Sequence, residues 1–221
     1  METVAAQFFN LDVMRQAWPL ILQGLGMTLL LCLAVIPLGL AGGLLVAMAS
    51  LSRSRLVRWS MRGLIDLFRA LPPLVVLILL YSGLPFAGIR LSPFAAVCLA
   101  FLLNNASFYG EIYRAGIESV GRGQWEAARS TGLTGAEAFA FVVLPQAVRN
   151  VLPDLLSNTV EVVKLTSIAS VVSFTELLYA ADMARSVTFN TSPIVLAALI
   201  YLVLLWPVVR LMSRLEHHIA T

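Results

Sequence analysis

Polar and charged side chains inside an otherwise apolar stretch are the residues of this sequence that could do chemistry. Five of them advance by three, one, three and three positions: Asp154, Ser157, Asn158, Glu161 and Lys164. At about 100° per residue, a helix places all five within a stripe of roughly 120°. Charges at the depth of a bilayer are costly and usually mark a functional pathway. The stripe therefore predicts one wet helix face, which borders a cavity or another subunit.

Two interpretations of the charged pair stay open. Glu161 and Lys164 have the spacing of a helical ion pair, which would seal contacts between helices. Alternatively, they form a site for a zwitterionic solute, with an ammonium near Glu161 and a carboxylate near Lys164. Thr166 and Ser167 follow and point away from the stripe if the helix stays regular. Their hydroxyls would then bond the backbone.

The composition predicts a membrane protein that forms one domain over residues 1–221. Of the 221 residues, 59% are hydrophobic and 12% charged, whereas a soluble domain carries about 25% charged residues. The net charge of +3 fits loop charge at a membrane surface better than nucleic-acid binding. Cys32 and Cys98 lie in apolar runs and are interpreted as small buried hydrophobes. No phosphate-binding Gly-Lys-Ser/Thr loop occurs, so a partner must handle any nucleotide.

The apolar runs predict an all-α protein with five transmembrane helices. A helix needs about 20 apolar residues to cross a bilayer. The expected spans cover residues 20–49, 63–81, 93–113, 150–178 and 186–209. The second includes a double proline, and the fourth carries the polar stripe.

A hinged pair of short helices is expected in the loop at about residues 120–146. Good helix formers occupy Gln124–Thr131, and Gly132 can take the left-handed conformation that ends a helix. Thr134 and Glu137 have the spacing of a capping box. The second helix is expected to stop at Pro145, whose ring cannot continue an established helix.

The spacing in this loop closely resembles the cytoplasmic coupling loop of binding-protein-dependent ABC import permeases. It reads Glu126-Ala127-Ala128, three residues, Gly132, nine residues, Val142-Val143-Leu144-Pro145. Val142 stands where the family usually has Ile. The resemblance implies that the loop contacts an ATPase through Glu126, Ala127, Ala128, Gly132, Leu144 and Pro145. An ordinary amphipathic hairpin between membrane helices is the competing interpretation.

Three further segments are similar to the polar amino-acid uptake branch of that family. They are Phe68–Leu74, with Ala70 in place of the usual Gly, Glu111–Ile117, and Lys164–Ser170. The branch often has an Asn-Glu pair where this chain has Ser157-Asn158. This chain therefore lacks a Glu at position 158 and carries one at position 161. Stripe and resemblance together predict a substrate path lined by Asn158, Glu161, Lys164, Thr166 and Ser167.

The resemblance implies the permease subunit of an ATP-driven importer of polar amino acids or related compounds. It also implies two cytoplasmic ATP-binding subunits, which hold ATP and Mg, a second permease subunit (identical or homologous), and an extracytoplasmic solute-binding protein. The chain itself is expected to be non-catalytic, without a cofactor or metal; its His217-His218 pair lacks further ligands. An ATP-independent secondary transporter or channel would explain the stripe but not the loop spacing. A membrane-embedded structural or receptor subunit would explain the glycines at positions 39, 42 and 43, which suit close helix packing, but not the stripe.

The basic residues predict the orientation in a bacterial inner membrane, because Lys and Arg concentrate on the cytoplasmic side. With the coupling loop inside, eleven of the fifteen Lys and Arg residues face inward. These eleven are Arg53, Arg55, Arg58, Arg62, Arg69, Arg114, Arg122, Arg129, Arg149, Arg210 and Arg214. Only Arg15, Arg90 and Arg185 face outward. Five spans then put the N-terminus outside and the C-terminus in the cytoplasm.

Overall fold

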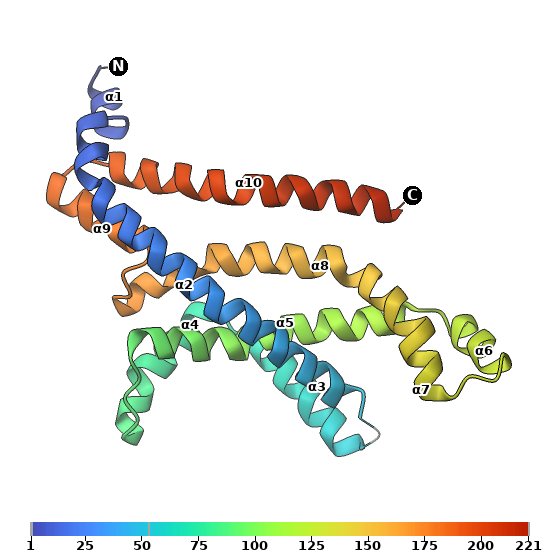
Figure 1. Cartoon of the computed structure of the whole chain (residues 1–221). Helices are drawn as coiled ribbons and strands as arrows, with labels where there is room; N and C mark the ends of the chain where they lie inside the picture. The colour runs from blue at the N-terminus through green and yellow to red at the C-terminus, as the bar shows by residue number, and fades with distance from the viewer. Residues whose placement is uncertain (1, 53, 221) are drawn as a thin grey trace. The chain divides into compact units, whose positions relative to one another are not determined.

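The computed structural model describes residues 2–52 and 54–220, and side chains for residues 4–52 and 54–212. All regular structure in this part of the chain is helical (Figure 1), which confirms the all-α prediction. The α-helices are α1 (Glu2–Phe8), α2 (Leu11–Ser50), α3 (Arg55–Ala70), α4 (Pro73–Ile78), α5 (Pro93–Ser119), α6 (Arg122–Ser130), α7 (Gly135–Ala138), α8 (Leu144–Leu165), α9 (Leu177–Thr188) and α10 (Ser192–Ala220). The π- and 3₁₀-helical turns are η1 (Leu79–Gly83), η2 (Leu84–Ala87), η3 (Phe139–Val143) and η4 (Thr166–Val172).

Four helical segments of the described chain are long and apolar enough to cross a membrane. They are Val4–Ser50, Pro93–Ser119, Gly135–Val172 and Ser192–Met212. A bent pair, Arg55–Ala70 and Pro73–Ala87, makes a fifth span if it is counted as one. The expected number of crossings is therefore reached only through a broken helix.

The second span is not one straight helix, contrary to the expectation for residues 63–81. Its two halves meet at an angle of 100°. A residue that precedes proline is pushed out of the helical region, and Leu71 is extended, with φ −85° and ψ 129°. Because Pro72 is followed directly by Pro73, α3 ends at Ala70 and α4 must start afresh. The basic stretch before this span is also partly helical, since α3 already begins at Arg55.

The prediction that the second coupling helix stops at Pro145 was wrong. The helix runs on from Gly135 to Val172 through the π-helical turn η3 and into α8. Proline is tolerated in the first turn of a helix, where its missing N–H and fixed φ cost little. Pro145 is the second residue of α8 and follows directly on the wider π turn. A local change of helix type thus absorbs the proline.

The later spans also differ in their boundaries. The helix of the fourth span breaks at Ser173, which has a positive φ of 58°, and residues 177 and 178 belong to the separate helix α9. The last span begins at Ser192 rather than at Ser186, because α9 continues to Thr188.

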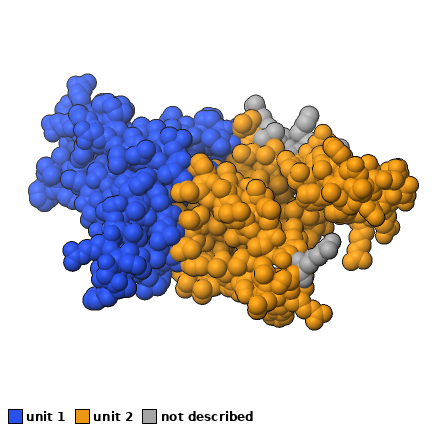
Figure 2. Space-filling view, turned by 60° about the horizontal axis from the view of Figure 1, so that its bottom comes forward, with its two compact units in different colours: residues 1–36, 73–100, 160–210 blue, residues 37–72, 101–159, 211–221 orange. Residues whose placement is uncertain are grey.

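The chain divides into two compact units, coloured separately in Figure 2. Unit 1 consists of Met1–Ile36, Pro73–Ala100 and Val160–Arg210, and unit 2 of Pro37–Pro72, Phe101–Thr159 and Leu211–Thr221. Helices α2, α5 and α8 each contribute residues to both units. A single domain over residues 1–221 stays a prediction.

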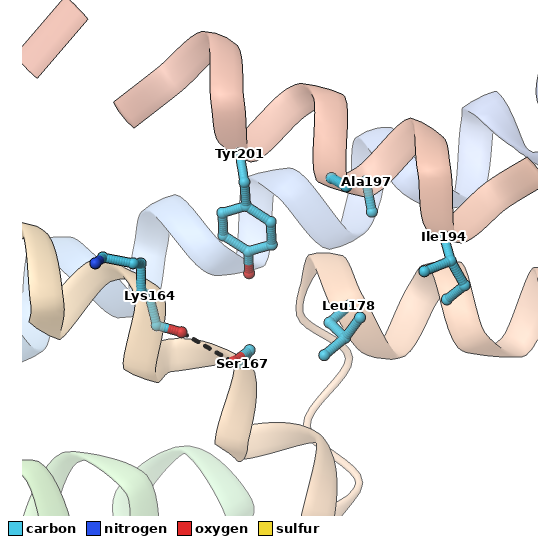
Figure 3. Close-up of a pocket in the computed structure, with 7 residues that line it drawn as sticks. Lys164, Ser167, Leu178, Ile194, Ala197 and Tyr201 are labelled. Carbon is cyan, nitrogen blue, oxygen red and sulfur yellow. Dashed lines mark hydrogen bonds between the residues drawn. The ribbon is translucent and has the colours of Figure 1, made fainter. Parts of the chain in front are cut away.

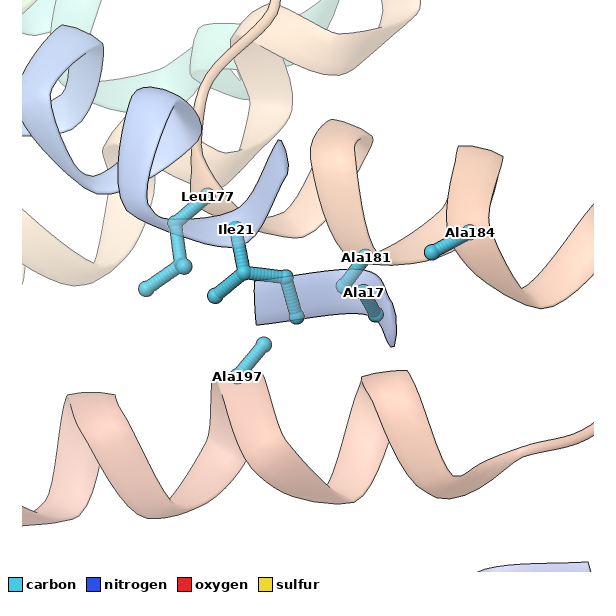
Figure 4. Close-up of a cluster of buried hydrophobic side chains, with 6 residues drawn as sticks. All are labelled: Ala17, Ile21, Leu177, Ala181, Ala184 and Ala197. Carbon is cyan, nitrogen blue, oxygen red and sulfur yellow. The ribbon is translucent and has the colours of Figure 1, made fainter. Parts of the chain in front are cut away.

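The core of unit 1 is made of small side chains where α2, α9 and α10 meet. Its buried members are Ala17, Ile21, Leu177, Ala181, Ala184 and Ala197. Figure 4 shows Ala197 of α10 pointing toward Ile21 of α2. A side chain at Gly24 would come within 2.6 Å of the Cβ of Ala180. Small residues at helix contacts let backbones approach closely, which is how helices associate in lipid.

The core of unit 2 is organised around Tyr109 of α5, which is fully buried. A side chain at Gly43 of α2 would lie 2.5 Å from the Tyr109 Cβ. The Tyr109 hydroxyl lies 2.8 Å from Thr159 Oγ1 of α8. Asn104 donates from Nδ2 to the Phe68 carbonyl of α3 at 2.9 Å. That carbonyl belongs to the last turn of α3 and would otherwise lack a partner.

Candidate functional site

The coupling segment, residues 122–145, has the predicted hinge. Helix α6 ends at Ser130, and Gly132 takes a positive φ of 90°. Thr134 and Glu137 form the capping box: Glu137 N donates to Thr134 Oγ1 at 3.3 Å, and Thr134 N donates to Glu137 Oε2 at 2.7 Å. Two orphan backbone donors at the start of α7 are thereby satisfied.

Aromatic stacking holds the two arms of the coupling segment together. The rings of Trp125 and Phe139 stack with centroids 6.1 Å apart and planes 28° apart. Both pack on a small buried cluster of Val120, Val143 and Ala147. Sequence reasoning assigned no role to this pair, because nothing local shows that position 125 meets position 139.

The residues of the resemblance motif divide into a buried and an exposed set. Ala128 is the buried member and lies on α6. The exposed members are Glu126, Ala127, Gly132, Leu144 and Pro145. The exposed apolar side chain of Phe141 lies on the π turn between them. The segment therefore presents a shaped surface of mixed polarity that another protein can contact.

The polar stripe lies on an exposed face of α8, as predicted. Asp154, Ser157, Glu161 and Lys164 are exposed and Asn158 is half-buried, whereas Val160 on the other side is buried. Glu161 and Lys164 form the ion pair of the first interpretation, and their side chains remain 59% and 49% exposed. The pair is thus formed but open to solvent, so a solute can still reach both charges.

The helix changes type directly after the charged pair. Thr166 and Ser167 begin the 3₁₀ turn η4, and both hydroxyls donate to the backbone, to Val163 O at 2.7 Å and Lys164 O at 2.9 Å. Backbone bonding of these hydroxyls is therefore confirmed. Thr166 is fully buried, so it supports the turn and does not meet a solute in this conformation.

A small pocket in unit 1 lies beside the charged pair. Its volume is about 240 Å³, and it is lined by Lys164, Ser167, Leu178, Ile194, Ala197, Ala198 and Tyr201. Figure 3 shows the Tyr201 hydroxyl pointing toward the side where Ser167 and Leu178 lie. The lining is mostly apolar, from Leu178, Ile194, Ala197 and Ala198. The Lys164 side chain extends away from the other lining residues (Figure 3), and its ammonium is paired with Glu161. Two of the predicted path residues, Lys164 and Ser167, line this pocket. Glu161 does not line it but is ion-paired with Lys164. Asn158 belongs to unit 2.

Glu176 does not line the pocket but holds two residues that do, Leu178 and Tyr201, and sequence reasoning missed this role. Its carboxylate is fully buried at the N-cap of α9 and accepts from Leu178 N at 2.8 Å and Tyr179 N at 2.7 Å. The Tyr201 hydroxyl also donates to it, at 3.3 Å. Glu is not among the residues that usually cap a helix N-terminus, and the link from Glu176 to Tyr201 of α10 is not local. His217 and His218 lie outside the residues whose side chains are described.

Comparison with known proteins decides the family. Residues 39–221 match the family model described as the binding-protein-dependent transport system inner membrane component. The chain belongs to this family of transport permeases. Its members are membrane components of transporters, which confirms the expectation drawn from the coupling-loop spacing and leaves the ATP-independent alternative without support.

Individual relatives of the permease agree with this assignment. A probable amino-acid ABC transporter permease of Bacillus subtilis is 36% identical over 194 residues, which cover 87% of this chain and 86% of that protein. A probable glutamine ABC transporter permease of the same organism is 34% identical and covers 90% of this chain and 92% of its own. A crystal structure of an amino acid ABC transporter with histidines superposes with a TM-score of 0.87 at 36% identity, over 93% of this chain and 96% of that chain.

Proposed function

We propose that this permease carries polar amino acids or closely related zwitterions. The observation that carries the proposal is the exposed Glu161–Lys164 pair next to a small pocket with an apolar wall. The relatives named for amino acids and glutamine support the same class. A zwitterion offers one ammonium and one carboxylate, which are the complements of Glu161 and Lys164.

The energetics of the pair suit a transport site. A solvent-exposed ion pair contributes only about 0–1 kcal/mol, so exchanging it for contacts with a solute costs little. The solute carboxylate would accept from Lys164, with Ser167 and Tyr201 close by, and its ammonium would pair with Glu161. Ala197 and Ala198 leave room for a small side chain. When the solute leaves, the pair forms again, so neither charge is left without a partner.

The proposed assembly contains four further components. Two cytoplasmic ATP-binding subunits hold ATP and Mg and carry out hydrolysis, a second permease subunit, identical or homologous, completes the path, and an extracytoplasmic solute-binding protein delivers the solute. The exposed coupling segment supports contact with the ATPase. Each nucleotide state of the ATPase would contact the inward-open and outward-open forms of the permease differently, and would thereby favour one of them. Glu126→Lys should weaken co-purification of the ATPase, because it reverses a charge in the exposed part of this segment.

We infer the orientation from the basic residues: N-terminus outside, coupling segment and C-terminus in the cytoplasm. Single-cysteine labelling with an impermeant reagent tests it. A cysteine at position 135 should react only after the membrane is opened. Labelling of that position from outside, in intact cells, would overturn the orientation.

Uptake by the reconstituted transporter tests the whole proposal. Proteoliposomes that contain the permease and its ATPase should accumulate a radiolabelled amino acid only with ATP inside and binding protein outside. Competition by unlabelled amino acids then ranks the solutes. Uptake driven by an ion gradient without ATP, or competition only by uncharged solutes, contradicts the proposal.

A further inference from the structure

Helix α3 has three distinct sides, and one of them carries its buried apolar contacts. At about 100° per residue, Met61, Leu64, Ile65 and Phe68 share one side. Ile65 on this side is the buried residue of the helix, and the other three are half-buried. The Phe68 carbonyl on the same side accepts the hydrogen bond from Asn104 of α5. This side therefore attaches α3 to unit 2.

A second side of α3 is apolar but exposed. Leu56, Trp59 and Leu67 fall within a sector of roughly 80°, and they are 77%, 70% and 54% exposed. Gly63, in open space, and exposed Ala70 continue the same strip. In a protein that spans a membrane, such a strip is covered by acyl chains or by another protein.

The third side, next to the exposed strip, is basic. Arg55, Arg58, Arg62 and Arg69 fall within another sector of roughly 80°, with Asp66 as the one acidic residue among them. None of these arginines forms an ion pair with a carboxylate of the described residues. Arg69 lies over the Phe108 ring at 5.3 Å from its centroid, and Arg58 donates to the Ser52 carbonyl at 3.2 Å, so Arg55 and Arg62 are the two most available for a ligand. Glu111 of α5 interacts with Arg62 and Arg69 but is already paired with Arg114.

We propose that α3, the half of the bent pair that precedes the break at Leu71, lies in the membrane interface and docks on the headgroups of anionic phospholipids, while Pro73–Ala87 after the 100° bend enters the membrane. Leu56, Trp59 and Leu67 insert among the acyl chains, while the arginines of the neighbouring side bind the phosphates. An amphipathic helix with arginine on one face and Trp and Leu on another has the composition of segments that lie in a membrane interface. The charge complementarity favours a lipid surface over a second protein, because four cations side by side would need a matching acidic partner. This surface is separate from the proposed solute site.

Quenching of Trp59 by brominated lipids tests the docking. The intact transporter is placed in nanodiscs of phosphatidylcholine that contain either dibrominated phosphatidylglycerol or dibrominated phosphatidylcholine. Phe replaces the other three tryptophans of the chain, Trp18, Trp125 and Trp206. A second variant also carries Trp59→Phe, and its fluorescence is subtracted to leave the signal of Trp59 alone. The proposal expects stronger quenching by the anionic lipid, by several-fold. Equal quenching by both lipids overturns the charge recognition, and quenching by neither shows that a protein covers the strip.

Paired arginine variants distinguish binding of anionic lipid at α3 from an effect of the protein's overall positive charge. Arg55→Gln with Arg62→Gln removes two exposed arginines, and because each charge near an anionic surface contributes about fivefold, quenching by the two brominated lipids should become nearly equal and the anionic preference should be lost. Arg122→Gln with Arg129→Gln removes the same charge from the coupling segment and should leave the preference unchanged. Arg55→Lys with Arg62→Lys should restore most of it. If excess inorganic phosphate abolishes the preference in the unmodified protein, the site binds free anions and the lipid proposal fails.

Discussion

The coupling segment and the pocket region, which comprises residues 161–178 and Tyr201, are built in opposite ways. In the coupling segment the contacts stay within the segment and its flanking residues: the capping box joins Thr134 to Glu137, and Trp125 stacks on Phe139. Most of its surface is exposed. In the pocket region the decisive contacts join distant parts of the chain. Glu176 meets Tyr201, and Leu177 N donates to Thr28 Oγ1 across 149 positions.

This difference indicates which region tolerates change. An exposed segment held by local hydrogen bonds can shift as a unit against a partner, because few buried contacts break when it moves. A buried carboxylate that satisfies two backbone donors and a hydroxyl cannot lose one partner without leaving another unpaired. We therefore expect stability to depend on the pocket region and coupling to depend on the hinge.

The largest effect should follow Glu176→Ala. The variant removes an N-cap and leaves the backbone N–H groups of half-buried Leu178 and Tyr179 without their partners, at a cost of about 2–4 kcal/mol. For a chain of this size the midpoint of thermal unfolding should fall by about 5–10 °C. The midpoint is measured on the purified transporter by loss of the monodisperse peak after heating. A shift no larger than that of Glu137→Ala would break the contrast between the two regions.

The charge swap Glu161→Lys with Lys164→Glu should come next. It preserves a local ion pair, so assembly stays normal, but it presents the wrong charge to each end of a zwitterion. Because hydrogen bonds to charged groups contribute about 1.5–3 kcal/mol, uptake should fall about tenfold to hundredfold. Uptake is measured in proteoliposomes, with Glu161→Gln as the single-charge comparison. Near-normal uptake by the swapped protein would leave the pair with a purely structural role.

Gly132→Val should uncouple transport with little loss of stability. A branched side chain costs about 1–2 kcal/mol in the left-handed conformation of the hinge, which corresponds to about fivefold to thirtyfold in the population of the competent state. Gly123→Val is the matched control, because Gly123 lies in open space within helix α6 and has no positive φ. ATP hydrolysis and uptake are measured together. Equal loss in both variants would show that the hinge conformation is not what matters.

The smallest effect should follow Glu137→Ala. The capping box is fully exposed, so water replaces the lost partner, and the loss of stability should be small. The expected change in the unfolding midpoint is about 1–4 °C, measured beside Glu176→Ala in the same preparation. A shift as large as that of Glu176→Ala would show that the coupling segment is as rigidly held as the pocket region.

Much of the fold follows from local sequence. The apolar runs determined where helices cross, and the hinge at Gly132 with its capping box followed from residue types within one turn. The break at Leu71 also had a local signal, the double proline, although the span was expected to be uninterrupted. The stripe on α8 was predictable because helical periodicity alone places its residues on one face.

Other features were decided only by the tertiary structure. Pro145 continues a helix because the π turn before it widens the backbone, and Trp125 stacks on Phe139 because the hinge folds α6 back. Glu176 reaches Tyr201 because α9 and α10 pack against α2 through alanines and Gly24. Local sequence limits the conformation of each turn, but which helices touch depends on the packing of many side chains at once. For this reason the sequence by itself determined the helices, the hinge and the polar stripe, whereas only the packed structure decided which residues enclose the pocket.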